Sequence, residues 1–350
     1  MAFRGKVCRR FEFRPLGPSA AARNGEPRGA AVALGQELHQ NYIAGLITRT
    51  SRGGFTSLRG EDPAMLKDIV ESLYAEQPQT LLYHYTSLAG LQGIVTSRKQ
   101  WASELRYMND GQELRQFVQH LDREIHKRLD AASGQADVLT QFRAFALARV
   151  ATGPMLFAIS FTEQGNLLSQ WRGYCPHGRG VSLGFTAERI IATAKAGGFS
   201  VGRCIYDAEH QSELAARVID AALTTAEALG PDAAAEPLHS YYRAFLSIEN
   251  DIIKISALVK NESFREEAEW RLVSEAFPRD AQAHVEYREG MSTLIPYIEL
   301  PHLDRTPLFD HVYLGPTPSG HLSMEALSKY LAKTQAAHEL ENSMTPLRIT

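Results

Sequence analysis

The pattern of hydrophobic and polar positions predicts short buried strands separated by amphipathic helices. Residues 155–161 (MLFAISF) and 180–185 (GVSLGF) are apolar runs of strand length, and residues 80–85 (TLLYHY) form a third. Residues 87–97 place apolar side chains at helical spacing after a Thr-Ser pair that can cap a helix. The chain therefore begins its ordered part with alternating strands and helices.

The same criteria predict the remaining elements. Helices are expected over residues 62–76, 111–132, 136–150, 211–229, 237–260 and 323–333, with a short one between residues 161 and 180. Strands are expected over residues 105–108, 201–206, 269–274, 284–287, 294–300 and 311–314. Strands run through the whole chain, and hairpin-like spacing dominates its last ninety residues. This favours an α+β fold, a mixed and mostly antiparallel sheet with several flanking helices, over a regular βαβ winding.

Composition narrows the class of protein. The 350 residues are 44% hydrophobic and 22% charged with a net charge of −3, a balance that excludes a mostly disordered, collagen-like or coiled-coil chain. No apolar run has the length of a membrane helix, so we expect no membrane span. Three cysteines, Cys8, Cys175 and Cys204, argue against a disulfide framework or a cysteine-rich zinc site and favour a reducing cytoplasm.

Charge is unevenly distributed along the chain. Residues 1–60 hold ten Lys/Arg and three Asp/Glu, about +7, which leaves the other 290 residues near −10. This start is rich in Gly, Ala, Pro and Arg and has no helical or strand period, so we predict a flexible basic segment over residues 1–60. A nucleic-acid-binding arm is the alternative for this segment. Residues 61–350 are predicted to form a single α+β domain, whose acidity argues against broad nucleic-acid binding by the domain itself.

Common signatures of cofactor and metal sites are absent. The sequence has no GxxxxGK[ST] phosphate loop, no GxGxxG after a strand and no HExxH. His177, His210 and His239 lack the spacing of metal ligands. We therefore expect chemistry that needs no metal.

Three segments place polar side chains where a buried element is expected. Residues 83–87 (YHYTS) put His84 in a strand, residues 160–162 (SFT) end a strand in hydroxyls before a helical Ser-Gln-Trp-Arg turn, and residues 267–272 (EAEWRL) open another strand. Period two puts Glu267, Glu269 and Arg271 on one face of that last strand. Each segment also has a structural interpretation: a satisfied core histidine with a cap, capping plus one packed tryptophan, or charges facing solvent. Asn109-Asp110 is either a turn or helix cap, or a polar pocket contact.

These segments belong to a longer series of motifs between about residues 80 and 348. The series comprises residues 83–87 (YHYTS), 101–102 (WA), 106–110 (RYMND) with Glu113, 160–161 (SF), 169–174 (SQWRGY), 178–185 (GRGVSLGF), 264–273 (FREEAEWRLV) and 314–316 (LGP). In this order the motifs resemble a bacterial family, DUF2971, over roughly three-quarters of the chain. The family is a domain of unknown function, so the resemblance identifies a fold group rather than a reaction.

A second resemblance implies chemistry. The order of a His strand followed by Thr-Ser, a hydroxyl-bearing strand before a Ser-containing helix, and a strand beginning with Glu is similar to ADP-ribosyltransferases of the poly-ADP-ribose-polymerase and RNA 2′-phosphotransferase type. Tyr85 stands where that family commonly has glycine. The resemblance implies an ADP-ribosyltransferase-like fold with NAD as substrate and no metal. It implies catalytic roles for Glu269 and His84, and a Glu267-x-Glu269 pair like that of arginine-modifying members.

The same resemblance implies a set of binding residues. Glu269 would stabilise the positive charge that develops on the ribose, and His84 would bind ribose hydroxyls. The implied NAD contacts are Tyr85, Thr86, Tyr107, Ser160, Ser169, Trp171 and Arg172, with Arg106, Asn109, Asp110, Gln170, Glu267 and Arg271 as further pocket candidates. Tyr107 or Trp171 would stack on the nicotinamide, and Arg172 with Arg106 would balance the pyrophosphate.

These implications leave three functions to compare. The first is NAD-dependent ADP-ribosyl transfer to a protein or nucleic-acid acceptor, or NAD cleavage, in a toxin or phage-defence setting. The second is a non-catalytic module that keeps the pocket to sense a nucleotide or bind a partner. The third is nucleic-acid processing that uses the basic segment, which would show salt-dependent binding.

Overall fold

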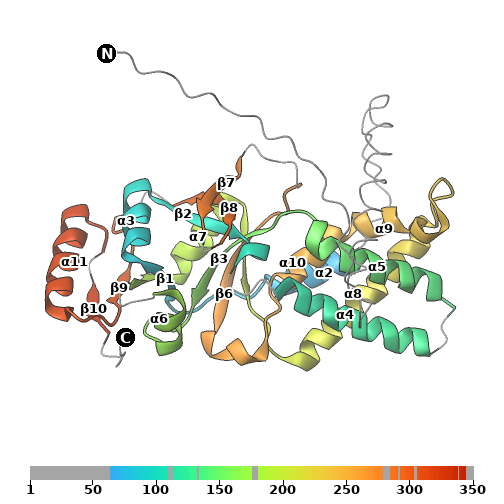
Figure 1. The fold of residues 1–350 in the computed structure, drawn as a ribbon, viewed down its shortest axis with the longest axis horizontal. Helices are drawn as coiled ribbons and strands as arrows, with labels where there is room; N and C mark the ends of the chain where they lie inside the picture. Colours follow the sequence, from blue (N-terminus) through green and yellow to red (C-terminus); the bar gives the residue numbers. More distant parts are fainter. Residues whose placement is uncertain are drawn as a thin grey trace, which may run out of the picture.

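A computed structural model describes residues 64–108, 113–131, 134–175, 180–278, 284–290, 292–302, 306–337 and 339–343. The predictions for residues 1–60 and for Asn109-Asp110 lie outside these residues. The described chain is α+β, with a ten-stranded sheet flanked by helices (Figure 1). This confirms the predicted α+β class.

The sheet is mostly antiparallel. Its strands are β1 (Leu82–Ser87), β2 (Lys99–Glu104), β3 (Phe157–Thr162), β4 (Gly180–Phe185), β5 (Phe199–Arg203), β6 (Glu269–Ser274), β7 (Glu286–Glu289), β8 (Leu294–Pro301), β9 (His311–Leu314) and β10 (Leu340–Asn342). They follow the order β10-β9-β4-β1-β3-β2-β8-β7, with β6 between β3 and β5 off this path. The pair β10-β9 is parallel, and the other pairs of named strands are antiparallel.

Helices surround the sheet and also form a bundle of their own. They are α2 (Ala64–Leu73), α3 (Leu88–Ser97), α4 (Glu113–Asp130), α5 (Ala136–Thr152), α6 (Leu168–Tyr174), α7 (Ala187–Gly197), α8 (Ala208–Leu229), α9 (Tyr242–Ser247), α10 (Glu249–Ser256) and α11 (Gly320–Thr334), with 3-10 turns η1 (Leu105–Tyr107), η3 (Pro237–His239) and η4 (Glu262–Glu267). No described helix combines the length and hydrophobicity needed to cross a membrane.

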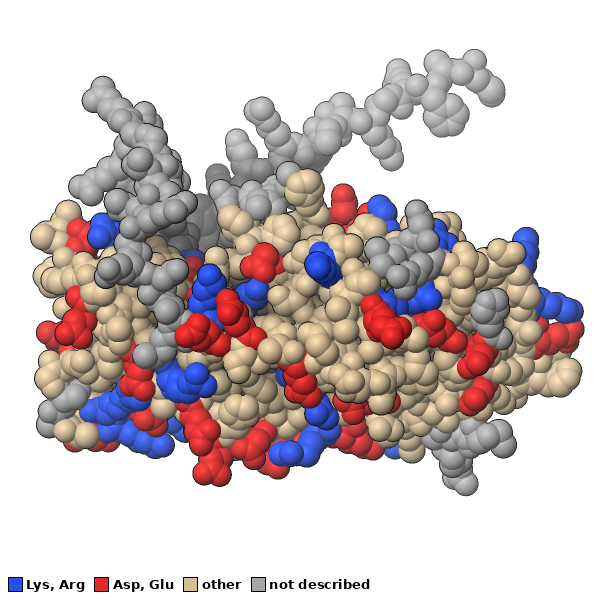
Figure 2. All heavy atoms as spheres, turned by 180° about the vertical axis from the view of Figure 1, so that it is seen from behind, with Lys and Arg blue, Asp and Glu red and all other residues tan. Residues whose placement is uncertain are grey.

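Two large apolar cores stabilise this arrangement. One lies against the sheet and joins strand residues such as Phe161, Leu183 and Leu272 to side chains of α3, α7 and α11. The other joins α2, α4, α5, α8, α9 and α10, which lie to one side of the sheet in Figure 1. On the face of the molecule shown in Figure 2, acidic and basic side chains are interspersed.

The sheet is split along one edge of β3. The start of β3 pairs with β2 through Ser103↔Ala158 and Glu104↔Phe157, whereas its end pairs with β1 through Tyr83↔Thr162. The middle of β3 has no register partner on this edge, although its other edge pairs with β6 from residue 158 to residue 162. The diverging strands β1 and β2 therefore open a gap beside Ser160.

Two predicted elements have a different secondary structure from the one expected. Residues 105–108 were expected as a strand, but Leu105–Tyr107 forms a 3-10 turn that Glu104 caps through a bond from Arg106 N (3.1 Å). Residues 237–260 were expected as one helix, but η3, α9 and α10 replace it, with Ile248 ending one helix and preceding the next. Capping by Glu104 accounts for the first difference, and tertiary packing overrides helical periodicity in the second.

Candidate functional site

A pocket of about 610 Å³ lies at the split in the sheet, and its lining includes Ser160 as well as Ile159 and Phe161 of the sheet core. It brings together several predicted site residues and some that were not predicted. The predicted ones are His84, Tyr85, Tyr107, Ser160, Gln170, Glu267, Glu269 and Arg271. The others include Tyr83, Trp101, Ser103, Thr162, Tyr174, Lys260, Arg288 and Glu289. Its volume falls in the range of small-molecule sites.

The three predicted segments meet through β3. Thr162 is paired with Tyr83 of β1 on one side and with Glu269 of β6 on the other, so the three residues form a row across the sheet. Two strand spacings amount to about 10 Å, which sets the distance between the histidine strand and the glutamate strand.

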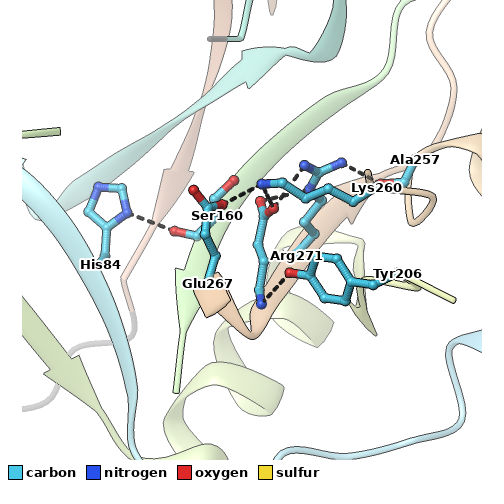
Figure 3. A network of polar contacts seen from close by, with 8 residues as sticks. His84, Ser160, Tyr206, Ala257, Lys260, Glu267 and Arg271 are labelled. Carbon is cyan, nitrogen blue, oxygen red and sulfur yellow. Dashed lines mark hydrogen bonds and ion pairs between the residues drawn. The ribbon is translucent and has the colours of Figure 1, made fainter. Parts of the chain in front are cut away.

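His84 bridges the split in the sheet. Its Nδ1 lies 3.0 Å from the carbonyl oxygen of Ser160 (Figure 3). Because a carbonyl accepts and does not donate, Nδ1 carries the proton and the neutral ring keeps Nε2 as an acceptor. Nε2 has no hydrogen-bond partner among the described residues. Burial lowers the pKa of His84, against the opposing effect of the Ser160 bond, so the ring is neutral near pH 7.

Ser160 adds a second unused polar atom at the same place. Its Oγ is buried without a hydrogen-bond partner, while the residue itself lines the pocket. Buried hydroxyl groups in native proteins normally have a partner, so an orphaned one indicates a position that a ligand or water completes.

Four charged side chains form a network at the start of β6, where Glu269 and Arg271 lie on the strand and Lys260 and Glu267 lie in the segment before it. Arg271 donates from Nε to Glu269 Oε1 (2.8 Å) and from Nη2 to Glu269 Oε2 (3.0 Å). Lys260 donates to both Glu267 Oε2 and Glu269 Oε2 (Figure 3). The backbone carbonyl of Ala257 accepts from Arg271 Nη1 (2.6 Å), and Glu269 N donates to the hydroxyl of Tyr206 (2.9 Å). The prediction that Glu269 and Arg271 share a face is confirmed, and both are buried rather than solvated.

The two glutamates of this network have pKa values displaced in opposite directions. Burial alone would raise the pKa of Glu269, but Arg271 and Lys260 outweigh it and hold that pKa well below its usual range. Burial also raises the pKa of Glu267, and Lys260 only partly offsets the rise. The network therefore favours the ionised form of Glu269, whereas burial favours the neutral form of Glu267.

Exposed aromatic side chains stand at the pocket. Trp101 is 48% exposed and Tyr107 is 43% exposed, although both line the pocket. Trp101 packs on Tyr297 with ring centroids 4.6 Å apart. Exposed aromatic faces are suited to stacking on planar ligands.

Several predicted contacts lie elsewhere. Trp171 is fully buried against Tyr85 (ring centroids 4.6 Å), and its Nε1 donates to Asn166 Oδ1 (2.8 Å), so it packs the protein and does not stack on a ligand. Arg106 pairs with Glu104 (2.7 Å) at a separate small cavity. Arg172 and Ser169 are exposed on α6 away from the pocket lining.

Two residues of β1 have mainly structural contacts. The Tyr85 hydroxyl donates to the Gln164 carbonyl and accepts from Leu167 N, each at 2.8 Å. Thr86 faces Gly90, where an added Cβ would lie 2.1 Å from Thr86 Oγ1. Tyr85 reaches the pocket lining, whereas Thr86 does not.

Pocket residues missed in the sequence came from weakly patterned segments. Lys260 follows a helix end, Ser103 belongs to a polar strand, and Arg288 lies on the short hairpin strand β7. Trp101, Tyr83, Thr162 and Tyr174 were the exceptions, because each lies inside a motif that the sequence analysis singled out.

The run Gly180-Val181-Ser182-Leu183-Gly184 has the letters GxSxG of a serine-hydrolase elbow, but it lies inside β4 rather than at a turn from strand to helix.

The described residues contain no group of three or more His, Cys, Asp or Glu side chains placed to hold a metal ion.

Comparison with known proteins supports the family resemblance over one segment. Residues 170–272 match a family model described as a protein of unknown function (DUF2971). The matched segment runs from α6 to β6 and includes Lys260, Glu267, Glu269 and Arg271 of the pocket. No curated protein and no solved structure matches the chain. Over residues 170–272, the chain is similar to the DUF2971 family.

Proposed function

We propose that the pocket binds NAD and cleaves the bond between nicotinamide and ribose, passing ADP-ribose to a protein or nucleic-acid acceptor or to water. One observation carries the proposal: His84, Ser160 and the Glu267–Lys260–Glu269–Arg271 network line a single pocket at a split in the sheet. We also propose that this split α+β sheet is of the ADP-ribosyltransferase type.

The residues supply what such a bond cleavage requires. Positive charge develops on the ribose as the nicotinamide leaves, and an anion fixed beside the ribose stabilises it. His84 lines the pocket, and we assign its Nε2 as the acceptor for a ribose hydroxyl, because Nδ1 is committed to the Ser160 carbonyl. Ser160 Oγ is available for the amide of the nicotinamide.

The contacts favour a different assignment of catalytic and positioning roles to Glu267 and Glu269 from the one expected from the sequence. Glu269 is 4% exposed and is bound by Arg271 and Lys260, so its charge is largely neutralised by them. Glu267 pairs with Lys260, and its side chain is 14% exposed at the end of η4. We therefore assign Glu267 as the carboxylate that meets the ribose and the attacking nucleophile. Glu269 becomes a positioning residue that holds Lys260 and Arg271.

The test uses the full chain with NAD and follows nicotinamide release by chromatography. Wild type is expected to release nicotinamide, and Glu267→Gln is expected to reduce the rate by about a hundredfold or more, within the range for loss of one acid–base group. Glu266→Gln is the matched control, because Glu266 is exposed on the same turn and does not line the pocket. No release by the folded wild type would contradict the proposal.

A second function rests on the neutralised state of Glu269. Since its carboxylate is fully engaged by two cations, the pocket also suits a module that binds a nucleotide without cleaving it. Saturable NAD binding with no nicotinamide release would support this function. The nucleic-acid alternative rests on residues 1–60, which lie outside the described residues. The face in Figure 2, where both signs of charge intermix, offers no extended basic surface for it.

A further inference from the structure

Arg288 is the cation among the described pocket residues that no described carboxylate neutralises. Of the three basic residues that line the pocket, Lys260 and Arg271 are paired with glutamates. Arg288 reaches across β8 and donates from Nη2 to Ser103 Oγ (3.0 Å), and it forms no ion pair with a described carboxylate. The side chain is half-buried, and burial lowers the pKa of Arg288, which shows that its charge is partly desolvated. A partly desolvated, unpaired guanidinium favours an anionic ligand.

An aromatic platform stands beside this cation. Trp101 and Ser103 are two residues apart on the same face of β2, which places their Cα atoms about 6.6 Å apart. Trp101 is held against Tyr297, and Tyr297 is the register partner of Ser103 on β8. The indole and the guanidinium held by Ser103 are thus neighbours on one rim of the pocket. A base and its 5′-phosphate, separated by one ribose, have a comparable spacing.

We propose that this rim binds a nucleoside diphosphate moiety, with the base stacked on Trp101 and the diphosphate held by Arg288. Ser103 orients the guanidinium, which binds phosphate oxygens through two parallel N–H bonds. In relation to NAD this inference rests on the proposed function and assigns the rim to the ADP half, the half that does not react. It replaces the sequence-based expectation that Arg172 and Arg106 balance the pyrophosphate.

The experiment measures ADP binding to the full chain without divalent cations, by calorimetry, with adenosine as the phosphate-free probe. Arg288→Gln is expected to weaken ADP binding by about tenfold or more, the effect of losing charge-assisted hydrogen bonds, and to leave adenosine binding within about twofold. Arg288→Lys is expected to restore part of the ADP affinity. Arg172→Gln is the matched control, because Arg172 is exposed and outside the pocket lining.

Tryptophan fluorescence reports on the platform independently. Trp171 and Trp270 are buried, so quenching on ligand addition reports mainly on Trp101. ADP is expected to quench wild type and to leave Trp101→Phe largely unchanged. Unfolding midpoints of every variant are compared with wild type, so that loss of binding is not confused with loss of fold.

The outcomes separate this inference from the proposed function. ADP binding that depends on Arg288 supports the rim site even if NAD is never cleaved. Conversely, nicotinamide release with ADP affinity unaffected by Arg288→Gln overturns the rim site and leaves the proposed function standing. Loss of ADP affinity in Arg172→Gln rather than in Arg288→Gln also overturns it.

Discussion

His84 donates its Nδ1 proton to the backbone carbonyl of Ser160 at the point where β3 has no partner strand on that edge. The hydrogen bond takes the place of a ladder bond in the split sheet and fixes the tautomer of the ring. One residue thus supports the fold through Nδ1 and also lines the pocket, while its Nε2 has no hydrogen-bond partner among the described residues. The two interpretations open at the sequence level, a satisfied core histidine and a ligand contact, concern different nitrogens of the same ring.

The two nitrogens can be separated by His84→Asn. An asparagine amide nitrogen reproduces the position of Nδ1 and leaves nothing at Nε2. We expect the unfolding midpoint to stay close to that of wild type, while nicotinamide release falls about tenfold, the effect of one lost hydrogen bond to the substrate. Chromatographic turnover and thermal melts measure the two quantities. Full activity in His84→Asn would show that Nε2 contributes only packing.

The Glu269 network predicts a loss of stability rather than a clean loss of activity. Glu269→Gln removes the carboxylate that binds Arg271 through two hydrogen bonds and leaves Lys260 with Glu267 alone, so we expect the free energy of unfolding to fall by about 3–5 kcal/mol. Urea titration measures this, and Glu266→Gln, exposed nearby, is expected to change it by less than about 0.5 kcal/mol.

A double variant tests whether the loss comes from unpaired charge. Adding Arg271→Met to Glu269→Gln removes the guanidinium that Glu269 bound through two hydrogen bonds, so the double variant is expected to be more stable than the sum of the single changes predicts. Strict additivity would show that the network is not coupled. Because of this stability loss, Glu267→Gln is the better probe of turnover.

The sequence alone predicted strand bounds and strand faces where the hydrophobic pattern agrees with the burial seen in the structure. β4 and β6 match their predicted bounds, and the alternation that placed Glu269 and Arg271 opposite Trp270 and Leu272 is observed. β2 escaped prediction because Gln100 and Glu104 are buried on the same face as Ala102, so the strand lacks the apolar alternation that marks a half-buried strand.

Other site residues depended on tertiary contacts that have no local signal. Trp171 shares a motif with Gln170, yet α6 turns the indole into the protein and the amide toward the pocket. Arg106 forms an ion pair with Glu104, only two residues earlier. Arg288 became a candidate only once β8 placed it beside Ser103. Periodicity identifies the face of an element, whereas the partner of a charged side chain is set by the packing of distant segments.

The pKa of Glu267 predicts the acid side of the activity profile. Burial raises this pKa, so a reaction that needs the ionised carboxylate loses rate on acidification at a higher pH than an ordinary glutamate would allow. The dependence of kcat/KM on pH measures this loss of rate at acidic pH. In Glu267→Gln the residual rate is expected to show no such acidic limb. A limb that persists unchanged in this variant would assign the titration to another group.

His302 predicts how stability itself responds to acid. The ring stacks on Phe185 (5.6 Å between centroids, 5° between planes), and its Nε2 is buried without a partner. Burial, with nearby Arg189, His84 and Arg98, lowers the pKa of His302 to about 4. An unfolded histidine has a pKa of about 6.5, so between these values the unfolded chain binds a proton that the folded chain does not.

The contribution of His302 is therefore complete above pH 6.5 and is lost as the pH falls to about 4. The 2.5-unit difference corresponds to about 3 kcal/mol in the free energy of unfolding. His302→Phe keeps a ring against Phe185 and cannot titrate, so it is expected to lose about 3 kcal/mol less than wild type between pH 7 and pH 4. His321→Asn, at an exposed histidine of α11, is the control and should follow wild type. Urea titrations at each pH measure how the free energy of unfolding changes with pH. The same change in wild type and His302→Phe would show that this ring is not the group that titrates.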